Sequence, residues 1–346
     1  MIVLLSGQIK NIGDFLITDR ARRLFEEFVD KEVVILDRTK KLDEHLDTIN
    51  KSRFVVLCGG PAYTPDIYKG IYPLVDDLSK IKVPIIPFGL GWCGRPSGNP
   101  EAFRFNKEST KFLQEVHTDI ENSSCRCLIT KGVLNNNGFN NVIMTGCPVW
   151  YDLPSMGKDF KDKKDIKHIV FTTAADPKLI GQTIKLIKAL TRQFPEAKIT
   201  MSYHRGILPD KHTTFRATIG YLAMYVGAKL TNSKVHIKDV SYDLKKLDFY
   251  DNCDFHIGYR VHAHLYFLSK RLPSILINED GRGKGMVETM NLPVFNVEDP
   301  DLIGKIDEKL AYYKTTNFSS FKDIGLYIDN QFEVMKGFLE GVTKYD

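Results

Sequence analysis

The first half of the chain alternates short, nearly continuous apolar runs with stretches of helical periodicity. An apolar stripe recurs at helical spacing over 14–29, and 66–80 has the same character. The predicted strands cover 2–5, 32–36, 54–57, 83–88, 127–130 and 142–144. Strands that alternate with helices favour a parallel, doubly wound sheet, and continuous apolar strands are typical of a sheet covered on both faces.

The same alternation begins again after a mixed charge run at 157–167, which we interpret as a solvated linker and a domain boundary. The predicted strands of this half cover 168–172, 198–203, 235–240, 254–257 and 274–277. Its predicted helices cover 178–194, 215–228, 261–270, 300–313 and 326–342. We therefore expect two α/β domains of the Rossmann type at 1–156 and 165–325. The remaining segment, 326–346, is expected to cross back to the first domain.

Length and composition agree with this organisation. A chain of 346 residues exceeds the roughly 250–300 at which single domains usually stop growing. With 43% hydrophobic and 26% charged residues, a sizeable buried core is expected. The net charge of +5 suits anionic substrates or an acidic membrane surface. Since no nucleic-acid-binding signature accompanies this charge, no nucleic-acid partner is expected.

Cysteine usage and hydropathy bear on the compartment. None of the six cysteines forms a C-x-x-C pair, so we expect buried free thiols in a reducing compartment. The apolar run at the N-terminus is too short for a signal peptide, and no stretch approaches the ~18 apolar residues of a membrane span. The sequence therefore predicts a cytoplasmic protein, whose contact with the inner face of a membrane would be peripheral.

Three loops of the first half follow predicted strands, where open α/β sheets place their ligands. Asn11, Gly13 and Asp14 come directly after the first strand. Gly13 allows close approach of the backbone to a ligand, and Asp14 can cap the following helix, whose N-terminus favours an anion. The two other loops contain Gly59, Gly60, Gly89 and Gly91. Each loop alone fits an ordinary turn, but together they predict one wall of a binding crevice.

The second half carries the residues best suited to chemistry. Arg260 and His262 stand two apart at a strand-to-helix junction, where Arg260 can hold an anion and His262 can shuttle protons. Arg282 and Lys284 follow the next strand, which should lie beside the first. Arg126, in the first half, is either a solvated charge or a guanidinium fork for a carboxylate or phosphate. These positions predict an anion-suited cleft between the domains.

The other histidines of this segment are assigned structural roles. His256 lies within a predicted strand, and His264 lies two residues beyond His262 on a helix. Because residues two apart on a helix do not share a face, His262 and His264 do not form a metal pair. No metal is expected.

This ordered set of motifs resembles the polysaccharide pyruvyl transferase family. The matching elements are an N-x-G-D element, a glycine-rich third-strand loop, a G-x-G and an R-x-H signature, and they extend from Asn11 to about Lys284. The residues that carry them are Asn11, Gly13, Asp14, Cys58, Gly59, Gly60, Gly89, Gly91, Asp254, Gly258, Arg260, His262 and Pro273. Gly146-Cys147-Pro148 resembles a variant found in some branches of the family.

The chain departs from the family pattern at two places. It has Arg126-Cys127 where the family commonly has Arg-Asp. It has Asp280-Gly281-Arg282 where the family often has D-P-K, so the positive charge stays but its geometry changes.

The resemblance implies a GT-B-like architecture, with the acceptor on the first domain and the donor on the second. It implies transfer of a pyruvyl unit from phosphoenolpyruvate to two hydroxyls of a sugar, giving a ketal. Phosphoenolpyruvate is then a co-substrate, no cofactor is needed, and the acceptor belongs to a polysaccharide or a precursor, including a lipid-linked one. His262 is the expected general acid, and Asp14 would orient the acceptor or act as base. The residues expected to hold the donor are Arg126, Arg260, Arg282 and Lys284.

Two other functions stay open. A nucleotide-sugar glycosyltransferase on the same fold would use similar cations and a carboxylate for the ribose, a part that Glu279 could play. A carbohydrate-binding protein without activity would bind sugar with no turnover, and the two departures from the family pattern motivate that alternative.

Overall fold

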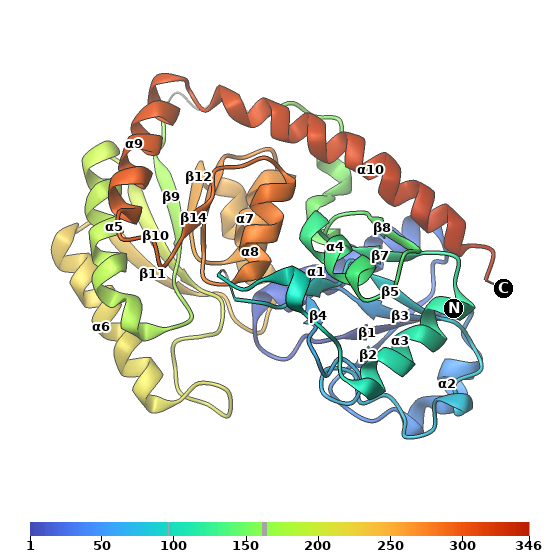
Figure 1. Ribbon diagram of the computed structural model, residues 1–346. Coiled ribbons are helices and arrows are strands. Elements are labelled where there is room, and N and C mark those ends of the chain that lie inside the picture. Colours follow the sequence, from blue (N-terminus) through green and yellow to red (C-terminus); the bar gives the residue numbers. More distant parts are fainter. Residues whose placement is uncertain (96, 161–164, 346) are drawn as a thin grey trace.

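Figure 1 shows the computed structural model of the chain, in which residues 1–95, 97–160 and 165–345 are described. A parallel four-stranded sheet with the order β2-β1-β3-β5 forms the first half. Two short parallel pairs, β4 with β6 and β7 with β8, lie at its edge. The bounds are β1 Ile2–Ser6, β2 Val33–Asp37, β3 Val55–Cys58, β4 Pro61–Tyr63, β5 Ile85–Phe88, β6 Gly91–Trp92, β7 Ser123–Cys125 and β8 Val142–Met144. All residues of β1, β3 and β5 are buried, as their apolar sequences predict.

The second half contains a parallel six-stranded sheet with the order β11-β10-β9-β12-β13-β14. Its strands are β9 His168–Thr172, β10 Lys198–Tyr203, β11 Val235–Asp239, β12 Phe255–Gly258, β13 Ser274–Asn278 and β14 Phe295–Asn296. The chain leaves β9 toward β10 and β11, then returns to place β12 on the other side of β9. Because parallel crossovers are right-handed, the helices before and after this reversal cover opposite faces of the sheet. Ligands of such sheets bind where the strand order reverses.

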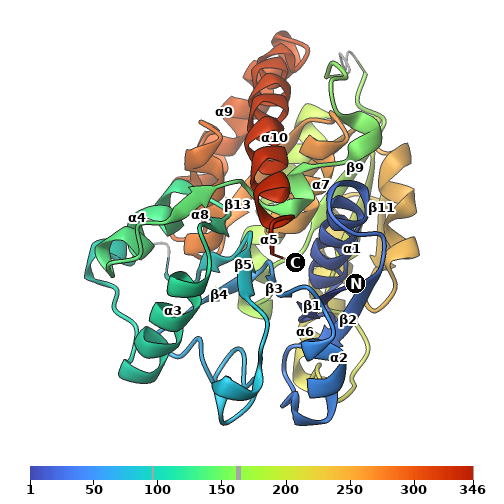
Figure 2. The ribbon, with the colours of Figure 1, turned by 90° about the vertical axis from the view of Figure 1, so that its right-hand side faces the viewer.

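Helices cover both sheets. Their bounds are α1 Ile12–Phe28, α2 Leu46–Asn50, α3 Lys107–Asp119, α4 Leu128–Asn136, α5 Ile180–Gln193, α6 Phe215–Thr231, α7 Val261–Ser269, α8 Gly281–Thr289, α9 Leu302–Thr315 and α10 Lys322–Val342. Figure 2 shows the same arrangement from the side. Eight of the nine residues of α7 are buried, which makes it the most enclosed helix of the second half. In the part of the chain that is described, no helix is both long and apolar enough to cross a membrane.

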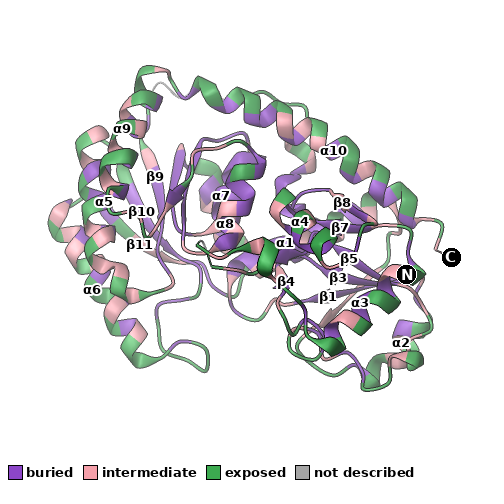
Figure 3. Cartoon of the chain, viewed as in Figure 1, coloured by how far each residue is buried: buried purple, intermediate pink, exposed green. Residues whose placement is uncertain are grey.

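The last helix, α10, runs from the second half along the first (Figure 1). Phe332 packs edge-on against Phe28 of α1, and Phe338 stacks on Phe88 of β5. Figure 3 shows α10 with exposed residues on its outer side and buried residues toward the body of the protein. The apolar face predicted by its spacing is therefore used to cover the first half.

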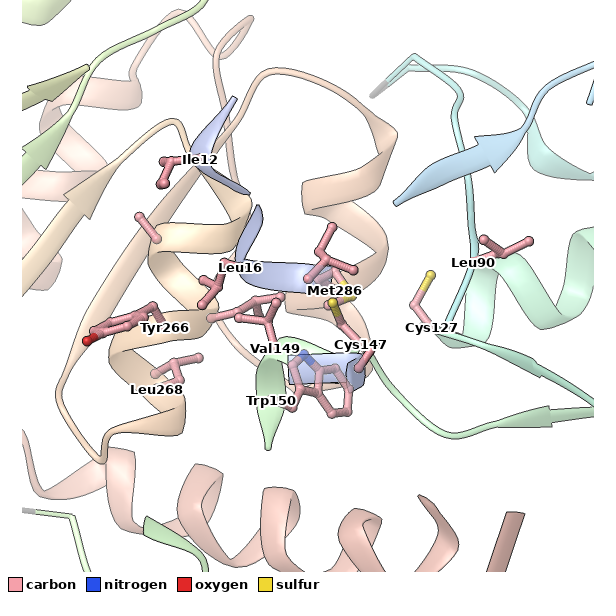
Figure 4. Packing of buried hydrophobic residues seen from close by; sticks show 14 of the residues in the cluster. Ile12, Leu16, Leu90, Cys127, Cys147, Val149, Trp150, Tyr266, Leu268 and Met286 are labelled. Carbon is pink, nitrogen blue, oxygen red and sulfur yellow. The ribbon is translucent and has the colours of Figure 1, made fainter. Parts of the chain in front are cut away.

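One hydrophobic core continues from the first half into the second (Figure 4). Leu16 of α1 and Trp150, in a 3-10 turn at Pro148–Trp150, lie beside Leu268 of α7 and Met286 of α8. The backbone N–H of Ile12 also donates to the carbonyl of His204, 3.1 Å away. The loop after β1 is thus held against the second sheet, which is what allows two distant segments to share a site.

Two of the predicted elements are wrong. The segment 127–130 is not a strand, because Cys127 is the N-cap of α4 and the strand is Ser123–Cys125. The hydropathy pattern does not predict this strand because its buried serines are polar. The Ser124 hydroxyl is satisfied by a hydrogen bond with the Thr145 hydroxyl. The predicted helix at 66–80 is only a 3-10 turn at Leu78–Lys80. Positive φ angles at Lys69 and Leu74 interrupt any helix there.

Further differences concern elements that hydropathy did not predict. Helix α3 begins after Asn106, whose side chain accepts a hydrogen bond from the Ser109 N–H. Helix α8 begins three residues after the end of β13, in a segment for which the sequence predicted no helix. The predicted linker at 157–167 includes 161–164, which lie outside the described residues. All six cysteines are free thiols, five of them buried as predicted and Cys93 exposed.

Candidate active site

A polar pocket lies where the first loop of the chain meets the carboxyl ends of β10, β12 and β13. The N-terminal ends of α1, α7 and α8 all contribute to it through N-cap or first-turn residues, so three helix N-termini, which favour anions, converge there. Its lining residues are Asn11, His204, Arg205, Tyr259, Arg260, Val261, His262, Glu279, Asp280 and Arg282. The structure therefore brings Asn11, Arg260, His262 and Arg282 together from distant parts of the sequence.

His262 stands at the centre of this pocket, only 7% exposed. Its ring lies so close to Gly13 that a β-carbon on Gly13 would overlap Nδ1. Nε2 is buried, and no hydrogen-bond partner for it exists among the described residues. Burial, with Arg126 and Arg282 nearby, lowers the pKa of His262 to about 3. The imidazole of the unliganded protein is therefore neutral at neutral pH, and its free nitrogen is available to a ligand.

The contact between Gly13 and His262 predicts the effect of an added methyl group. Gly13→Ala should lower the free energy of unfolding by about 1–3 kcal/mol, because helix α1 or the imidazole must move to admit the β-carbon. Urea denaturation measures this change. Gly132→Ala in α4 is the matched control, since within the described structure nothing lies within 4 Å of the added carbon. Equal stability of the two variants would contradict the close packing.

Arg260 is the N-cap residue of α7, directly after β12. Its backbone N–H donates to the Thr172 hydroxyl at 3.2 Å, which fixes the turn. Its Nη1 lies 3.9 Å from Oε2 of Glu279, and its buried Nε has no partner in the described part of the chain. The Oε1 of Glu279 accepts the N–H of Ala175 at 2.8 Å. Arg260 is thus oriented by one weak ion pair and keeps donors free.

Arg282 and Asp280 form a second charged pair in the pocket. Asp280 caps α8 by accepting the backbone N–H of Arg282 at 3.0 Å, and the Arg282 Nε donates to Oδ2 of Asp280 at 2.7 Å. Burial opposes ionisation of Asp280, but the bonds from Arg282 hold its pKa below the usual value. The capping aspartate therefore sets the direction of the Arg282 guanidinium.

Arg126 lies behind His262 and does not line the pocket itself. It is 1% exposed, and its Nη2 donates to the carbonyl of Trp92 at 3.2 Å. A β-carbon on Gly91 would overlap this guanidinium, so the Arg126 side chain can take this position only because residue 91 is glycine. The Arg126 Nε is buried without a hydrogen-bond partner anywhere in the described ranges. Its charge contributes to the low pKa of His262.

Asp14 does not cap α1, because the N-cap position is Asn11 and Asp14 lies in the first helical turn. The Asn11 side chain donates to Oδ2 of Asp14 at 3.1 Å. Burial raises the pKa of Asp14, although Arg38 and Arg282 act in the opposite direction. Asp14 does not line the pocket, but the charges of Arg282 and Arg205, which do, act on its carboxyl group.

Two arginines of this region were not singled out from the sequence. Arg38 follows β2, donates to the carbonyl of Gly59 at 3.4 Å and lies 5.5 Å from the ring centre of Tyr72. Arg205 follows β10 and lines the pocket. Both stand just beyond the carboxyl end of a parallel strand, and that position is the signal that could have identified them.

Other predicted residues lie outside the pocket. Lys284 projects from α8 with its ammonium 3.8 Å from the carboxylate of Glu288, and it is not a lining residue. The positive-φ glycines of the first-half loops also do not line the pocket, although Gly60 lies near Arg38. Among the glycines singled out from the sequence, these are Gly59, Gly60 and Gly89.

His256 and His264 are buried and share the Ser274 hydroxyl, each through Nδ1 at 2.7 Å. Both therefore hold β12, α7 and β13 together. Within residues 1–95, 97–160 and 165–345, no group of three or more His, Cys, Asp or Glu side chains is placed to hold a metal ion.

Solved structures with the same architecture define the fold. S. aureus MnaA in a co-structure with UDP is 14% identical, covers 99% of this chain and 98% of its own, and has a TM-score of 0.54. The UDP-GlcNAc 2-epimerase from Neisseria meningitidis bound to UDP-GlcNAc is 13% identical, with 98% and 99% coverage and a TM-score of 0.51. The wall teichoic acid polymerase TagF is 12% identical, with 98% and 88% coverage and a TM-score of 0.50. The chain therefore has a GT-B-like α/β fold, as predicted.

The amino-acid sequence identifies the family to which the chain belongs. Residues 11–281 match the polysaccharide pyruvyl transferase family. Since this match covers most of the chain, the protein belongs to that family, and the resemblance seen in its motifs is confirmed. No curated protein matches the chain.

Proposed function

We propose that this protein transfers a pyruvyl group from phosphoenolpyruvate to two hydroxyls of a sugar in a polysaccharide or its precursor, forming a ketal. The observation that carries the proposal is the free Nε2 of His262, buried in a pocket that Arg260 and Arg282 also line. A buried polar nitrogen without a partner is costly unless a ligand completes it. Membership of the pyruvyl transferase family supports the same assignment.

Phosphoenolpyruvate matches the charges of this pocket. It carries a carboxylate and a phosphate, and guanidinium groups bind both through paired hydrogen bonds. Arg260 has an unpartnered buried Nε in the described structure, whereas Arg282 is oriented by Asp280. Arg205, which also lines the pocket, adds a third cation. We assign the donor to the second sheet and the acceptor to the side of Asp14.

The reaction adds two hydroxyls to C2 of the donor and releases phosphate. Nε2 of His262, protonated once the anionic donor is bound, gives its proton to C3, so the methylene becomes a methyl and C2 gains oxocarbenium character. The first hydroxyl then adds to C2 and returns its proton to Nε2. The bond from C2 to the phosphate oxygen then breaks. The second hydroxyl forms the second C2–O bond, and its proton leaves with the phosphate, with Asp14 as the intermediate acceptor. One molecule of inorganic phosphate is released for each ketal formed.

The neutral state of His262 changes the role expected from the sequence. Because burial lowers its pKa to about 3, the imidazole of the free protein is neutral and is not a pre-formed imidazolium acid. It gains its acidic proton when the anionic donor binds and raises its pKa, and the attacking hydroxyl restores that proton. His262 is therefore proposed as a proton shuttle between hydroxyl and methylene.

Donor binding is the first test. Phosphoenolpyruvate should raise the melting temperature of the wild-type protein, since a ligand at 100 times its Kd stabilises by about 2.7 kcal/mol. Arg260→Ala should weaken binding about 10–100-fold, the value of one lost charge-assisted contact. Arg192→Ala, which removes an exposed arginine of α5, is the matched control. Circular dichroism of Arg260→Ala would verify that the variant is folded.

The same thermal-shift measurement, made with UDP-sugars, tests the alternative that the protein is a nucleotide-sugar transferase. Such a transferase would need a carboxylate side chain that binds the ribose, and Glu279 lines the pocket. S. aureus MnaA was solved with UDP. In this chain the Glu279 carboxylate is already bonded to the Ala175 N–H and close to Arg260. A thermal shift with UDP-sugars and none with phosphoenolpyruvate would overturn the pyruvyl proposal. Binding of phosphoenolpyruvate with no phosphate release across an acceptor panel would point to the inactive carbohydrate-binding homologue.

A further inference from the structure

Helix α6 exposes a continuous apolar stripe to solvent. Five residues at helical spacing make up this stripe, and they extend over about 22 Å of the helix axis. They are Phe215 at 69% exposed, Ile219 at 54%, Leu222 at 43%, Val226 at 53% and Leu230 at 84%. Single exposed apolar residues are common, but an aligned row of five large ones marks a surface that binds something.

The stripe is not needed for folding of the second half. A different face of α6, with Tyr221 and Met224, is buried. A third face meets α5 and the 3-10 turn before it, since a β-carbon on Gly227 would overlap Ile184 and one on Gly220 would overlap Pro177. Figures 1 and 3 show α6 on the side of the second sheet that faces away from the first. The apolar row is therefore open along its length.

The surroundings of the stripe are positively charged. Residues 211–238 contain five lysines and arginines and no Asp or Glu, although Lys234 pairs with Glu196. Helix α5 contains three and no Asp or Glu, although Arg192 pairs with Asp307. Lys185, Lys188 and Arg216 are exposed and take part in no ion pair among the described residues. Because α5 and α6 lie on the same face of the sheet, their exposed side chains share one outer surface.

From this combination we propose that the stripe of α6 and the lysines of α5 form a docking surface for an anionic phospholipid bilayer. An apolar helix face that enters the acyl boundary, flanked by cations that meet lipid phosphates, is the pattern of interfacial helices. A second copy of this chain fits less well, because pairing two α6 helices would bring like charges together with no carboxylate on either helix. The proposal does not depend on the assigned reaction.

Such docking would place the pocket close to the membrane surface. The loop that carries Arg205 ends at Thr214, the N-cap residue of α6. Its conformation is held by Lys10, whose ammonium donates to Asp210 at 2.7 Å and to Thr213 at 2.5 Å. Membrane contact at α6 therefore connects through one short loop to a residue that lines the pocket.

Vesicle sedimentation of the purified full chain tests the proposal. The protein should sediment with vesicles of equal parts phosphatidylglycerol and phosphatidylcholine, and less with phosphatidylcholine alone. The double variant I219E/V226E should lower the partition coefficient by at least about tenfold, because two apolar contacts are lost and two negative charges are added. K185Q/K188Q should weaken only the preference for phosphatidylglycerol.

The matched control is L326E/V334E, which changes two exposed apolar residues of α10. It should sediment like the wild type, and equal melting temperatures of all variants would verify folding. Sedimentation that is absent in the wild type, or unchanged in I219E/V226E, would overturn the proposal. So would a concentration-dependent dimer, seen by light scattering, that the same variant abolishes, since the stripe would then bind a second copy. Donor binding measured on I219E/V226E should be unchanged, which separates this test from that of the reaction.

Discussion

His262→Gln should lower kcat by about 10²–10⁴-fold, the usual contribution of a well-placed proton-transfer group. Nε2 of His262 is buried in the pocket without a partner among the described residues, so the side chain has no structural bond there to lose. Glutamine has a similar size but does not titrate, so it keeps the volume and removes the proton shuttle. The measurement is phosphate release from phosphoenolpyruvate in the presence of an acceptor sugar, with Kd for the donor measured in parallel.

His45→Gln is the control, because His45 is exposed in the first half. It should leave kcat and donor affinity unchanged. In His262→Gln, donor affinity should change far less than kcat, since the arginines that hold the donor remain. Near-normal turnover would remove His262 from the proton path, and a loss confined to affinity would make it a binding residue.

Acidification should destabilise the protein steeply between about pH 6.5 and pH 3. Four buried histidines have lowered pKa values: His204, His256, His262 and His264. For His264, burial lowers the pKa from 6.5 to about 3. Below pH 6.5 the unfolded chain binds a proton at each such site before the folded protein does. The stabilisation is thus fully present above the unfolded pKa and is lost as the pH falls, by about 1.4 kcal/mol per pH unit for each histidine.

The contribution of one histidine can be isolated by His264→Gln. This variant should show a shallower fall in stability by about 1.4 kcal/mol per pH unit, measured by urea denaturation at several pH values between 7.5 and 5. All other titrating groups are shared with the wild type, so they cancel in the difference. His45→Gln should follow the wild-type slope. Parallel curves for wild type and His264→Gln would show that folding does not lower the pKa of His264.

The alternation of apolar runs and helical stretches was sufficient to predict the α/β class and most strands of both sheets. It worked because the central strands are buried on both faces and are therefore almost purely apolar, as in β1 and β3. It failed at Ser123–Cys125, where a buried strand is polar and its hydroxyls are paired by hydrogen bonds. A hydropathy pattern does not indicate which buried hydroxyls will be paired by hydrogen bonds in the folded protein.

The sequence by itself also placed Arg260 and His262 at the end of a strand, because the R-x-H motif follows a short apolar run directly. Only the tertiary structure decided that His262 packs on Gly13, that Arg126 lies behind it and that Lys284 points elsewhere. The neutral state of His262 could not be predicted from the sequence either, since its pKa depends on burial and on charges that the fold brings near. Local pattern determines elements and candidate residues, whereas distances between segments far apart in the chain determine which of them share a site.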